Sequence, residues 1–288
     1  MRRYLIAYTF LTPALALLMV FTFYPIVMGL VMMFYDYTFL EPMRFVGLGN
    51  FERAFHDPDF LISLLHSIQY VIVVPPIQIL SILVAILVNR RLFGISFFRT
   101  TYYVPVVTSM VAVAITWKWL YDSHGLLNYI LQALHLVDKP VYWLTSKELA
   151  MPSVMMVTLW KGIGWYMLIY LAGLQSVPAE LEEAAAIDGA SRWQVFSKVT
   201  VPLLRPYVLF CTFMSILGAL QVFEEIYVMT GGGPMKATLT VSVYQFYKAF
   251  GDYDFGYAAA VGMVVALLVA IFNLGMFRTL AKGGLRYY

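Results

Sequence analysis

Charge is scarce in this sequence. Asp, Glu, Lys and Arg make up only 12% of the 288 residues, whereas a soluble domain carries about 25%. Hydrophobic residues make up 61% of the chain. This balance excludes an ordinary soluble domain and predicts an integral membrane protein.

Residues for covalent, metal and nucleotide chemistry are scarce as well. The single cysteine, Cys211, excludes an intrachain disulfide, and we interpret it as a small apolar residue within a span. The 4 histidines lack the spacing of metal ligands, so we predict no metal site and no catalytic histidine. The sequence has no GxxxxGKS/T phosphate loop, which means that any ATP must bind to a different chain.

Six apolar stretches approach the length of about 20 residues that a spanning helix requires. The first begins with MRRYL, as secretory signals do, but its apolar run continues through Val31, so we expect an uncleaved span. The predicted fold is all-α, an integral membrane protein with six transmembrane helices that form one domain over residues 1–288. The six stretches are residues 4–35, 60–89, 100–117, 149–175, 207–223 and 255–277.

The distribution of Lys and Arg predicts the orientation of the chain. Of the 19 basic residues, 11 fall on one side of the predicted spans. Basic residues are enriched in cytoplasmic segments, so both termini and the polar segment 176–206 are expected on the cytoplasmic side. The 11 residues are Arg2, Arg3, Arg90, Arg91, Arg99, Arg192, Lys198, Arg205, Arg278, Lys282 and Arg286.

The polar segment 176–206 lies between the fourth and fifth predicted spans and has the pattern of a helix, a tight turn and a second helix. Pro178 suits a first helical turn, and the glutamates that follow complement the positive end of the helix dipole. Asp188 and Gly189 are expected to end this helix, because glycine takes the left-handed conformation of many C-terminal caps.

The second helix is predicted to start directly after this turn. Ser191 and Gln194 have the spacing of a capping box. Pro202 and Pro206 are expected to end or kink the helix. A compact helical elbow that caps itself is suited to docking another protein. Two aromatic side chains project from one face of its second helix, Trp193 and Phe196.

The segment 176–206 resembles the EAA loop of bacterial ABC-import permeases, in the sugar-uptake branch of that family. In that family the loop is a coupling helix that seats in a cleft of a separate ATPase subunit. The one departure from the usual pattern is Val199, where isoleucine is commoner. The matching positions are Glu183, Ala184, Ala185, Asp188, Gly189, Ala190, Phe196, Val199, Pro202 and Pro206.

The resemblance implies the fold of a type I ABC importer transmembrane domain in the cytoplasmic membrane of a bacterium or archaeon. It also implies an external solute-binding protein, two ATPase subunits and a second, non-identical permease subunit. ATP and Mg²⁺ would belong to the ATPase subunits, with no cofactor on this chain. Four further stretches extend the resemblance: residues 45–51, 97–105, 170–178 and 229–234. The loop residues expected to couple to the ATPase are Glu183, Ala184, Ala185, Asp188, Gly189, Ala190, Trp193 and Phe196.

The elbow has two alternative interpretations. One is an ordinary solvated loop. The other is a helix-turn-helix that reads DNA, but Arg192, Lys198 and Arg205 are too few to form a basic footprint, and the elbow lies between membrane spans. We therefore expect no nucleic-acid partner.

Polar residues at membrane depth are candidates for a substrate pathway, because lipid offers them no partners. The fourth span contains WKGIGW, residues 160–165, whose indole faces can stack on the C–H face of a sugar. Lys161 lies 14 residues before Gln175, about 21 Å along a helix and past the middle of a core about 30 Å thick. The resemblance places substrate contacts at Lys161, Gly162 and Trp165. Alternatively, the tryptophans form an interfacial belt and Lys161 extends to the interface.

The fifth span completes the predicted pathway. Gly218 and Gln221 share a helical face with Ser215, and Glu224 and Glu225 follow near the outer end of the span, of which Glu224 is assigned to the pathway. Contacts between helices are the alternative role for Ser215 and Gly218. Three secondary candidates are more typical of helix contacts than of a pathway: Gln69, Gln78 and Asn273.

The sequence thus predicts a permease subunit of an ATP-driven importer that moves a carbohydrate or related polyol by alternating access. One alternative is a secondary transporter driven by an ion gradient, which requires paired ionisable residues within the spans. Lys161 has no evident carboxylate partner in the sequence. A membrane-embedded enzyme is the other alternative, and it requires a deep nucleophile or carboxylate pair that the spans lack.

Overall fold

The computed structural model describes residues 2–39, 41–89 and 94–281. Four of the basic residues used to predict the orientation, Arg90, Arg91, Lys282 and Arg286, lie outside these ranges. Packing divides the chain into two compact units. The first comprises Met1–Leu61 and Tyr244–Ile271, and the second comprises Ile62–Val243 and Phe272–Tyr288. The prediction of one membrane domain stays a prediction, and the two units are described separately below.

Five helical segments within the described residues are long and apolar enough to cross a membrane, and a sixth is added if one bent pair counts as a single span. The prediction of six spans corresponds to the larger number. The segments are Tyr8–Met32, Pro58–Val88, Ala150–Gln175, Arg192–Met229 and Phe255–Phe272, together with the pair Ile95–Val107 and Met110–Leu120.

The first unit begins with the helices α1 (Arg2–Leu18) and α2 (Tyr24–Met32), which are joined by a π-helical turn, Met19–Phe23. Most described side chains of this span are apolar and exposed within the chain, as expected of a helix that faces lipid or another subunit. An antiparallel hairpin follows, formed by β1 (Tyr35–Thr38) and β2 (Glu41–Phe45). The prediction of an all-helical chain missed this small sheet.

The helices α3 (Gly49–His56) and α15 (Phe255–Ala281) complete the first unit with the end of α14 (Val241–Phe246) and a π-helical turn, Tyr247–Gly251. The hairpin lies directly on the start of α15. A Cβ atom at Gly256 would lie 2.0 Å from the backbone oxygen of Tyr35, so only glycine allows this approach.

A polar cluster joins α3 to the start of α15. Arg53 Nη1 donates to Asp254 Oδ2 at 2.6 Å, and its guanidinium lies 4.1 Å from the ring centre of Tyr257. The hydroxyls of Tyr244 and Tyr257 both donate to Asp57 Oδ2. Burial by itself raises the pKa of Asp57, but these bonds, with two from backbone N–H groups, outweigh it, so the pKa lies below its ordinary value.

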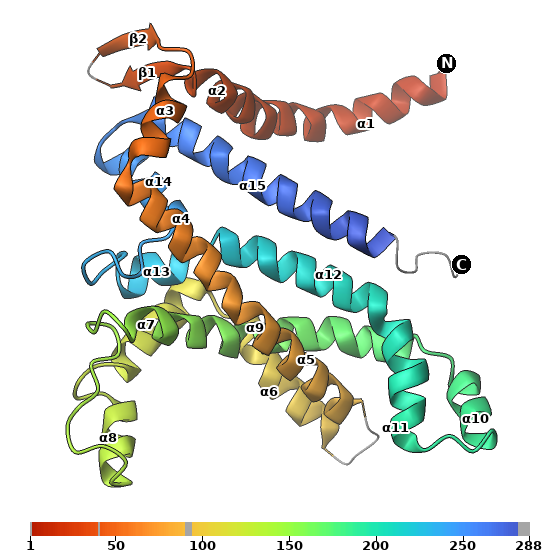
Figure 1. The fold of residues 1–288 in the computed structure, drawn as a ribbon. Helices are drawn as coiled ribbons and strands as arrows, with labels where there is room; N and C mark the ends of the chain where they lie inside the picture. Colours follow the sequence, from red (N-terminus) through yellow and green to blue (C-terminus); the bar gives the residue numbers. More distant parts are fainter. Residues whose placement is uncertain (1, 40, 90–93, 282–288) are drawn as a thin grey trace. The chain divides into compact units, whose positions relative to one another are not determined.

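The second unit is built around three helices, α5 (Val74–Val88), α9 (Ala150–Gln175) and α12 (Val201–Leu220), which pack together in Figure 1. The second span enters this bundle through α4 (Pro58–Tyr70) and a 3₁₀ turn, Val71–Val73. The close contact of α9 with α12 requires Gly173, because a Cβ atom there would lie 2.8 Å from the ring of Tyr207.

A buried hydrogen-bond network links the three helices. Gln78 Nε2 on α5 donates to Ser215 Oγ on α12 at 2.5 Å, and the Tyr170 hydroxyl on α9 donates to Gln78 Oε1. Ser215 Oγ in turn donates to the Cys211 oxygen at 2.5 Å. Gln78 therefore acts as a contact between helices, which confirms the interpretation from the sequence. Of the other secondary candidates, the side chain of Asn273 lies outside the described residues.

The third predicted span, residues 100–117, is not one straight helix. It consists of α6 (Ile95–Val107) and α7 (Met110–Leu120), which are bent by 99°. Thr108 and Ser109 have ψ values of 138° and 136°, which interrupt the helical backbone. The prediction of a continuous span was therefore wrong at this point.

The remaining elements of the second unit are short helices. They are α8 (Leu126–Ala133), α10 (Ala179–Ile187), α11 (Arg192–Val195) and α13 (Glu224–Met229). In Figure 1, α10 and α11 lie at one end of α12, whereas α13 lies at its other end.

Candidate functional site

The helical elbow has the two caps that its sequence predicted. Gly189 has φ +85°, and its N–H donates to the Ala186 oxygen at 3.1 Å. The Ala190 N–H donates to the Ala185 oxygen at 3.0 Å, which completes a Schellman motif at the end of α10. Pro178 is the residue before α10 rather than its first helical residue.

The second helix of the elbow starts with the predicted capping box. Ser191 Oγ accepts a hydrogen bond from the backbone of Gln194, whose side chain accepts one from the backbone of Ser191. The helix does not end at Pro202. It passes through a π-helical turn, Phe196–Thr200, and continues as α12. The π turn changes the pattern of backbone hydrogen bonds just before Pro202. Pro202 therefore stands in the first turn of α12, where its missing N–H is tolerated.

A partly buried hydrogen bond joins the two arms of the elbow. Thr200 Oγ1 donates to Glu182 Oε1 at 2.8 Å, and Thr200 is 5% exposed. Beneath the elbow lies a cavity of about 360 Å³ whose walls include Ala186, Ala190 and Phe196. The elbow is therefore a defined substructure with its own internal contacts.

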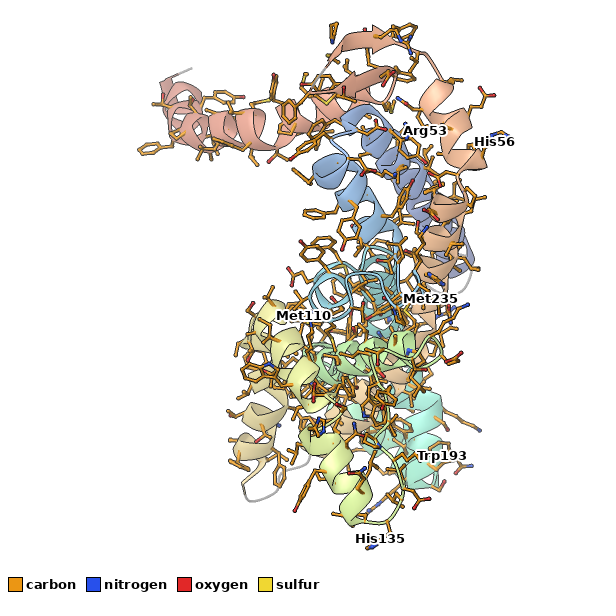
Figure 2. All side chains as sticks on the ribbon, turned by 90° about the vertical axis from the view of Figure 1, so that its left-hand side faces the viewer. Arg53, His56, Met110, His135, Trp193 and Met235 are labelled. Atoms are coloured by element: carbon orange, nitrogen blue, oxygen red, sulfur yellow. The ribbon has the colours of Figure 1, made fainter. Side chains whose placement is uncertain are left out.

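The outer surface of the elbow carries large apolar side chains. Ile187 is 86% exposed and Trp193 is 71% exposed, and Leu181 is also exposed. Figure 2 labels Trp193 on the elbow, where its indole extends away from the helices. The indole lies beside the ring of Phe196, with ring centres 5.7 Å apart and the ring planes tilted by 40°. Apolar side chains on a polar, capped loop are typical of a surface that another protein covers.

Near the other end of α12 lies a pocket of about 320 Å³. Its walls come mainly from α9 and α12, with single residues from α4, α5 and α13 and from each side of the break between α6 and α7. Four of the six predicted pathway residues line it, namely Lys161, Gly162, Trp165 and Gly218. The other lining residues are Tyr70, Val73, Ile77, Val106, Met110, Thr158, Tyr166, Ser215, Ala219 and Glu225.

The other two predicted pathway residues, Gln221 and Glu224, are exposed and are not part of this wall. Gln221 ends α12 with φ −108° and ψ 18°, and α13 starts again at Glu224. This interruption changes the helical phase, so Glu225 rather than Glu224 faces the pocket. The prediction placed both Glu224 and Glu225 near the outer end of the span but assigned only Glu224 to the pathway.

Glu225 ends a chain of three hydrogen-bonded side chains. Thr158 Oγ1 donates to Glu225 Oε1 at 2.8 Å, and the Tyr70 hydroxyl lies 2.6 Å from Thr158 Oγ1. Since the single Thr158 proton goes to the carboxylate, the Tyr70 hydroxyl donates to Thr158. Sequence reasoning missed Tyr70 and Thr158 because both are common residues in apolar helices. A carboxylate beside an apolar stretch was the available signal for Glu225.

Lys161 contacts backbone rather than another side chain. Its ammonium donates to the Thr108 oxygen at 2.5 Å, the Pro105 oxygen at 2.8 Å and, at a longer 3.4 Å, the Val106 oxygen. Among the described residues, no carboxylate lies within ion-pair distance of it. These residues also include no group of three or more His, Cys, Asp or Glu side chains placed to hold a metal ion.

A pocket among spanning helices lies near one end of α12, and an exposed apolar surface lies at the other end. Comparison with known proteins places the chain in a family. It belongs to the binding-protein-dependent transport system inner membrane components, whose pattern matches residues 64–278. The chain is therefore a permease subunit of a multi-pass membrane transporter that works with a binding protein.

Curated relatives match over nearly the whole chain. The lactose transport system permease protein LacF of Rhizobium radiobacter is 37% identical, over 93% of this chain and 91% of the relative. The trehalose/maltose transport system permease protein MalF of Thermococcus litoralis is 34% identical, over 95% and 94%. The diacetylchitobiose uptake system permease protein NgcF of Streptomyces coelicolor is 34% identical, over 91% and 78%.

A solved structure has the same fold. A chain in the crystal structure of a bacterial ABC transporter involved in the import of the acidic polysaccharide alginate superposes with a TM-score of 0.84 at 24% identity, covering 98% of this chain and 97% of that chain. A second structure of an alginate transporter, in complex with a periplasmic protein bound to an alginate pentasaccharide, gives a TM-score of 0.83. The predicted ABC importer permease fold is thereby confirmed.

Proposed function

We propose that this permease imports a carbohydrate or related polyol by alternating access and that the pocket between α5, α9 and α12 is part of its pathway. The observation that carries the proposal is the composition of the pocket wall. Trp165 and Tyr166 line the pocket with aromatic rings, and Thr158 and Glu225 line it with polar atoms. Aromatic faces beside hydrogen-bonding groups suit the two kinds of surface of a sugar. The names of the relatives, which mention lactose, trehalose, maltose and diacetylchitobiose, support this class of solute.

The elbow is proposed as the site that couples transport to ATP hydrolysis on two separate ATPase subunits. Its exposed Ile187 and Trp193 would be covered by an ATPase, and its two caps make it stiff enough to transmit a displacement. The coupling residues proposed are Glu183, Ala184, Ala185, Asp188, Gly189, Ala190, Trp193 and Phe196. ATP and Mg²⁺ would bind to the ATPase subunits and not to this chain.

A second, non-identical permease subunit is proposed to complete the pathway. Exposed apolar side chains on α1 and α2 are available to face that subunit or lipid. The excess of Lys and Arg on the elbow side supports cytoplasmic termini and an external binding protein on the opposite side. The ion-driven secondary transporter considered above is not favoured by the family to which the chain belongs.

The experiment that tests this function is purification of the tagged chain in a mild detergent from cells that produce its natural partners. We expect an ATPase and a second permease to copurify in stoichiometric amounts and the preparation to hydrolyse ATP. The same cells are then assayed with radiolabelled lactose, trehalose and diacetylchitobiose. Purification of the chain alone would contradict the coupling proposal. A copurifying ATPase without ATP-dependent uptake of any of these sugars would contradict the proposed solute class.

A further inference from the structure

We propose that Lys161 is a positioning residue that holds the break between α6 and α7, rather than a donor to the transported solute. The break lies at membrane depth and lines the pocket, and non-helical backbone at that depth needs hydrogen-bond donors from the protein or from a cavity. A helix end leaves its last four C=O groups without partners within the helix. Because α6 ends at Val107, its last backbone oxygens need hydrogen-bond donors from outside the helix.

The donors for this break come almost entirely from two side chains. Lys161 donates to the oxygens of Pro105, Val106 and Thr108 at 2.8, 3.4 and 2.5 Å. Thr108 Oγ1 donates back to the Val104 oxygen at 3.0 Å. An ammonium has three N–H donors, and three backbone oxygens here accept from it. A lysine bound in this way has no N–H left for a sugar hydroxyl.

Electrostatics favours the same role. The three oxygens belong to the C-terminal end of α6, which carries the negative end of the helix dipole, and a cation is stabilised there. The carboxylate that faces the same pocket is that of Glu225, which accepts from Thr158 rather than from Lys161. Lys161 therefore donates to backbone oxygens of the broken span, while the carboxylates of Glu224 and Glu225 attract its charge without a hydrogen bond to it among the described residues.

A second residue of α9 holds α6 at close range. A Cβ atom at Gly164 would lie 2.0 Å from the Tyr102 oxygen, so the backbones of α6 and α9 touch at this point. Gly164 lies three residues after Lys161, on the same face of α9. One residue thus fixes α6 through its lack of a side chain and the other through its ammonium.

The consequence for transport is that Lys161 sets the shape of the pocket wall. Val106 and Met110 stand on either side of the break and line the pocket that Lys161 also lines. This consequence rests on the proposed function, whereas the contact itself does not. A measurement made without any solute therefore tests the contact of Lys161 with the break independently of the proposed transport function.

The test uses electron–electron distance measurements between spin labels on cysteines introduced at Phe97 on α6 and Trp119 on α7, which are 72% and 75% exposed. The complete transporter is studied in nanodiscs without solute or nucleotide. A rotation of about 20° at the break would move the far end of α7, a helix of 11 residues or about 16 Å, by about 6 Å.

We expect Lys161→Met to shift or broaden the distance distribution by about this amount and Lys161→Arg, which keeps its donors, to retain the original distribution. Lys118→Met is the matched control, because Lys118 lies on α7 and makes one long bond of 3.5 Å to the Val228 oxygen. An unchanged distribution in Lys161→Met would overturn the proposal. If that variant does not assemble, Lys161→Gln, which is shorter and has two donors, must shift or broaden the distribution relative to that of the unsubstituted chain, and an unchanged distribution there overturns the proposal equally.

Discussion

Thr200 and Glu182 are 18 residues apart and belong to opposite arms of the elbow, yet Thr200 Oγ1 donates to Glu182 Oε1 at 2.8 Å. This bond connects the first helix of the elbow to the π turn from which α12 continues. A displacement of α10 therefore acts on α12 directly and not only through the turn at Gly189. The bond is internal to the elbow, so a variant that lacks it can keep the outer surface unchanged.

Thr200→Val is the first prediction. Valine has nearly the shape of threonine but leaves the Glu182 carboxylate without this donor, at a cost of about 1 kcal/mol. We expect the ATPase to copurify normally while the ratio of solute transported to ATP hydrolysed falls. Thr101→Val is the matched control, because the Thr101 hydroxyl bonds within its own helix to the Phe97 oxygen at 2.9 Å. An unchanged ratio in Thr200→Val would show that the bond has no part in coupling.

Gly189→Val is predicted to misplace the second arm of the elbow. Gly189 has φ +85°, where a β-branched residue is strained by about 1–2 kcal/mol, even though a Cβ atom there meets nothing within 4 Å. The strain is relieved if Ser191 and the helix α11 that follows it move. We expect weaker retention of the ATPase during purification. Gly29→Val, at an equally open glycine without positive φ, should retain it fully. Normal retention in Gly189→Val would mean that this cap does not position the docking surface.

Gly218→Leu is predicted to fill the pocket. A Cβ atom at Gly218 meets nothing within 4 Å, so the side chain enters open space without distorting α12. Uptake is expected to fall by about tenfold or more, equivalent to about 1.4 kcal/mol in a barrier, with assembly and basal ATP hydrolysis retained. Gly218→Ala should transport nearly normally. Equal transport by both variants would remove this pocket from the pathway.

The Asp57 cluster predicts a dependence of stability on pH. The pKa of Asp57 is lowered in the folded chain, so its carboxylate contributes stability above its unfolded pKa of about 3.9 and loses it as the pH falls through the folded pKa. We expect Asp57→Asn to weaken the first unit at about pH 7 and to flatten its loss of stability below about pH 4. Hydrogen exchange in α3 and α14 measures this. Asp36→Asn, which removes an exposed pair with Arg44, is the control and should leave the profile unchanged.

Features that depend on neighbouring residues were predictable from the sequence. The capping box at Ser191 and the left-handed cap at Gly189 each need only four to six consecutive residues, and both have the predicted geometry. The spans were predictable for the same reason, because each is a run of consecutive, mostly apolar residues. The resemblance of residues 176–206 to a known family loop also pointed to the family to which the chain belongs.

Features that depend on distant contacts were not predictable. The break after Val107 is stabilised by Lys161, more than 50 residues later, and nothing in the sequence of α6 alone indicates that a donor will be present. Proline is tolerated in spanning helices, so Pro105 by itself did not predict a bend of 99°. The choice of Glu225 over Glu224 depends in turn on where α12 ends, and helix ends are the least certain part of a sequence pattern.

The network around Gln78 has a mechanical meaning. A slide of one residue between α5 and α12 is about 1.5 Å and would break the 2.5 Å bond between Gln78 Nε2 and Ser215 Oγ. Tyr170 holds the same amide from α9. These bonds oppose sliding among the three helices, so we expect a displacement of the elbow at one end of α12 to be transmitted to the pocket near its other end.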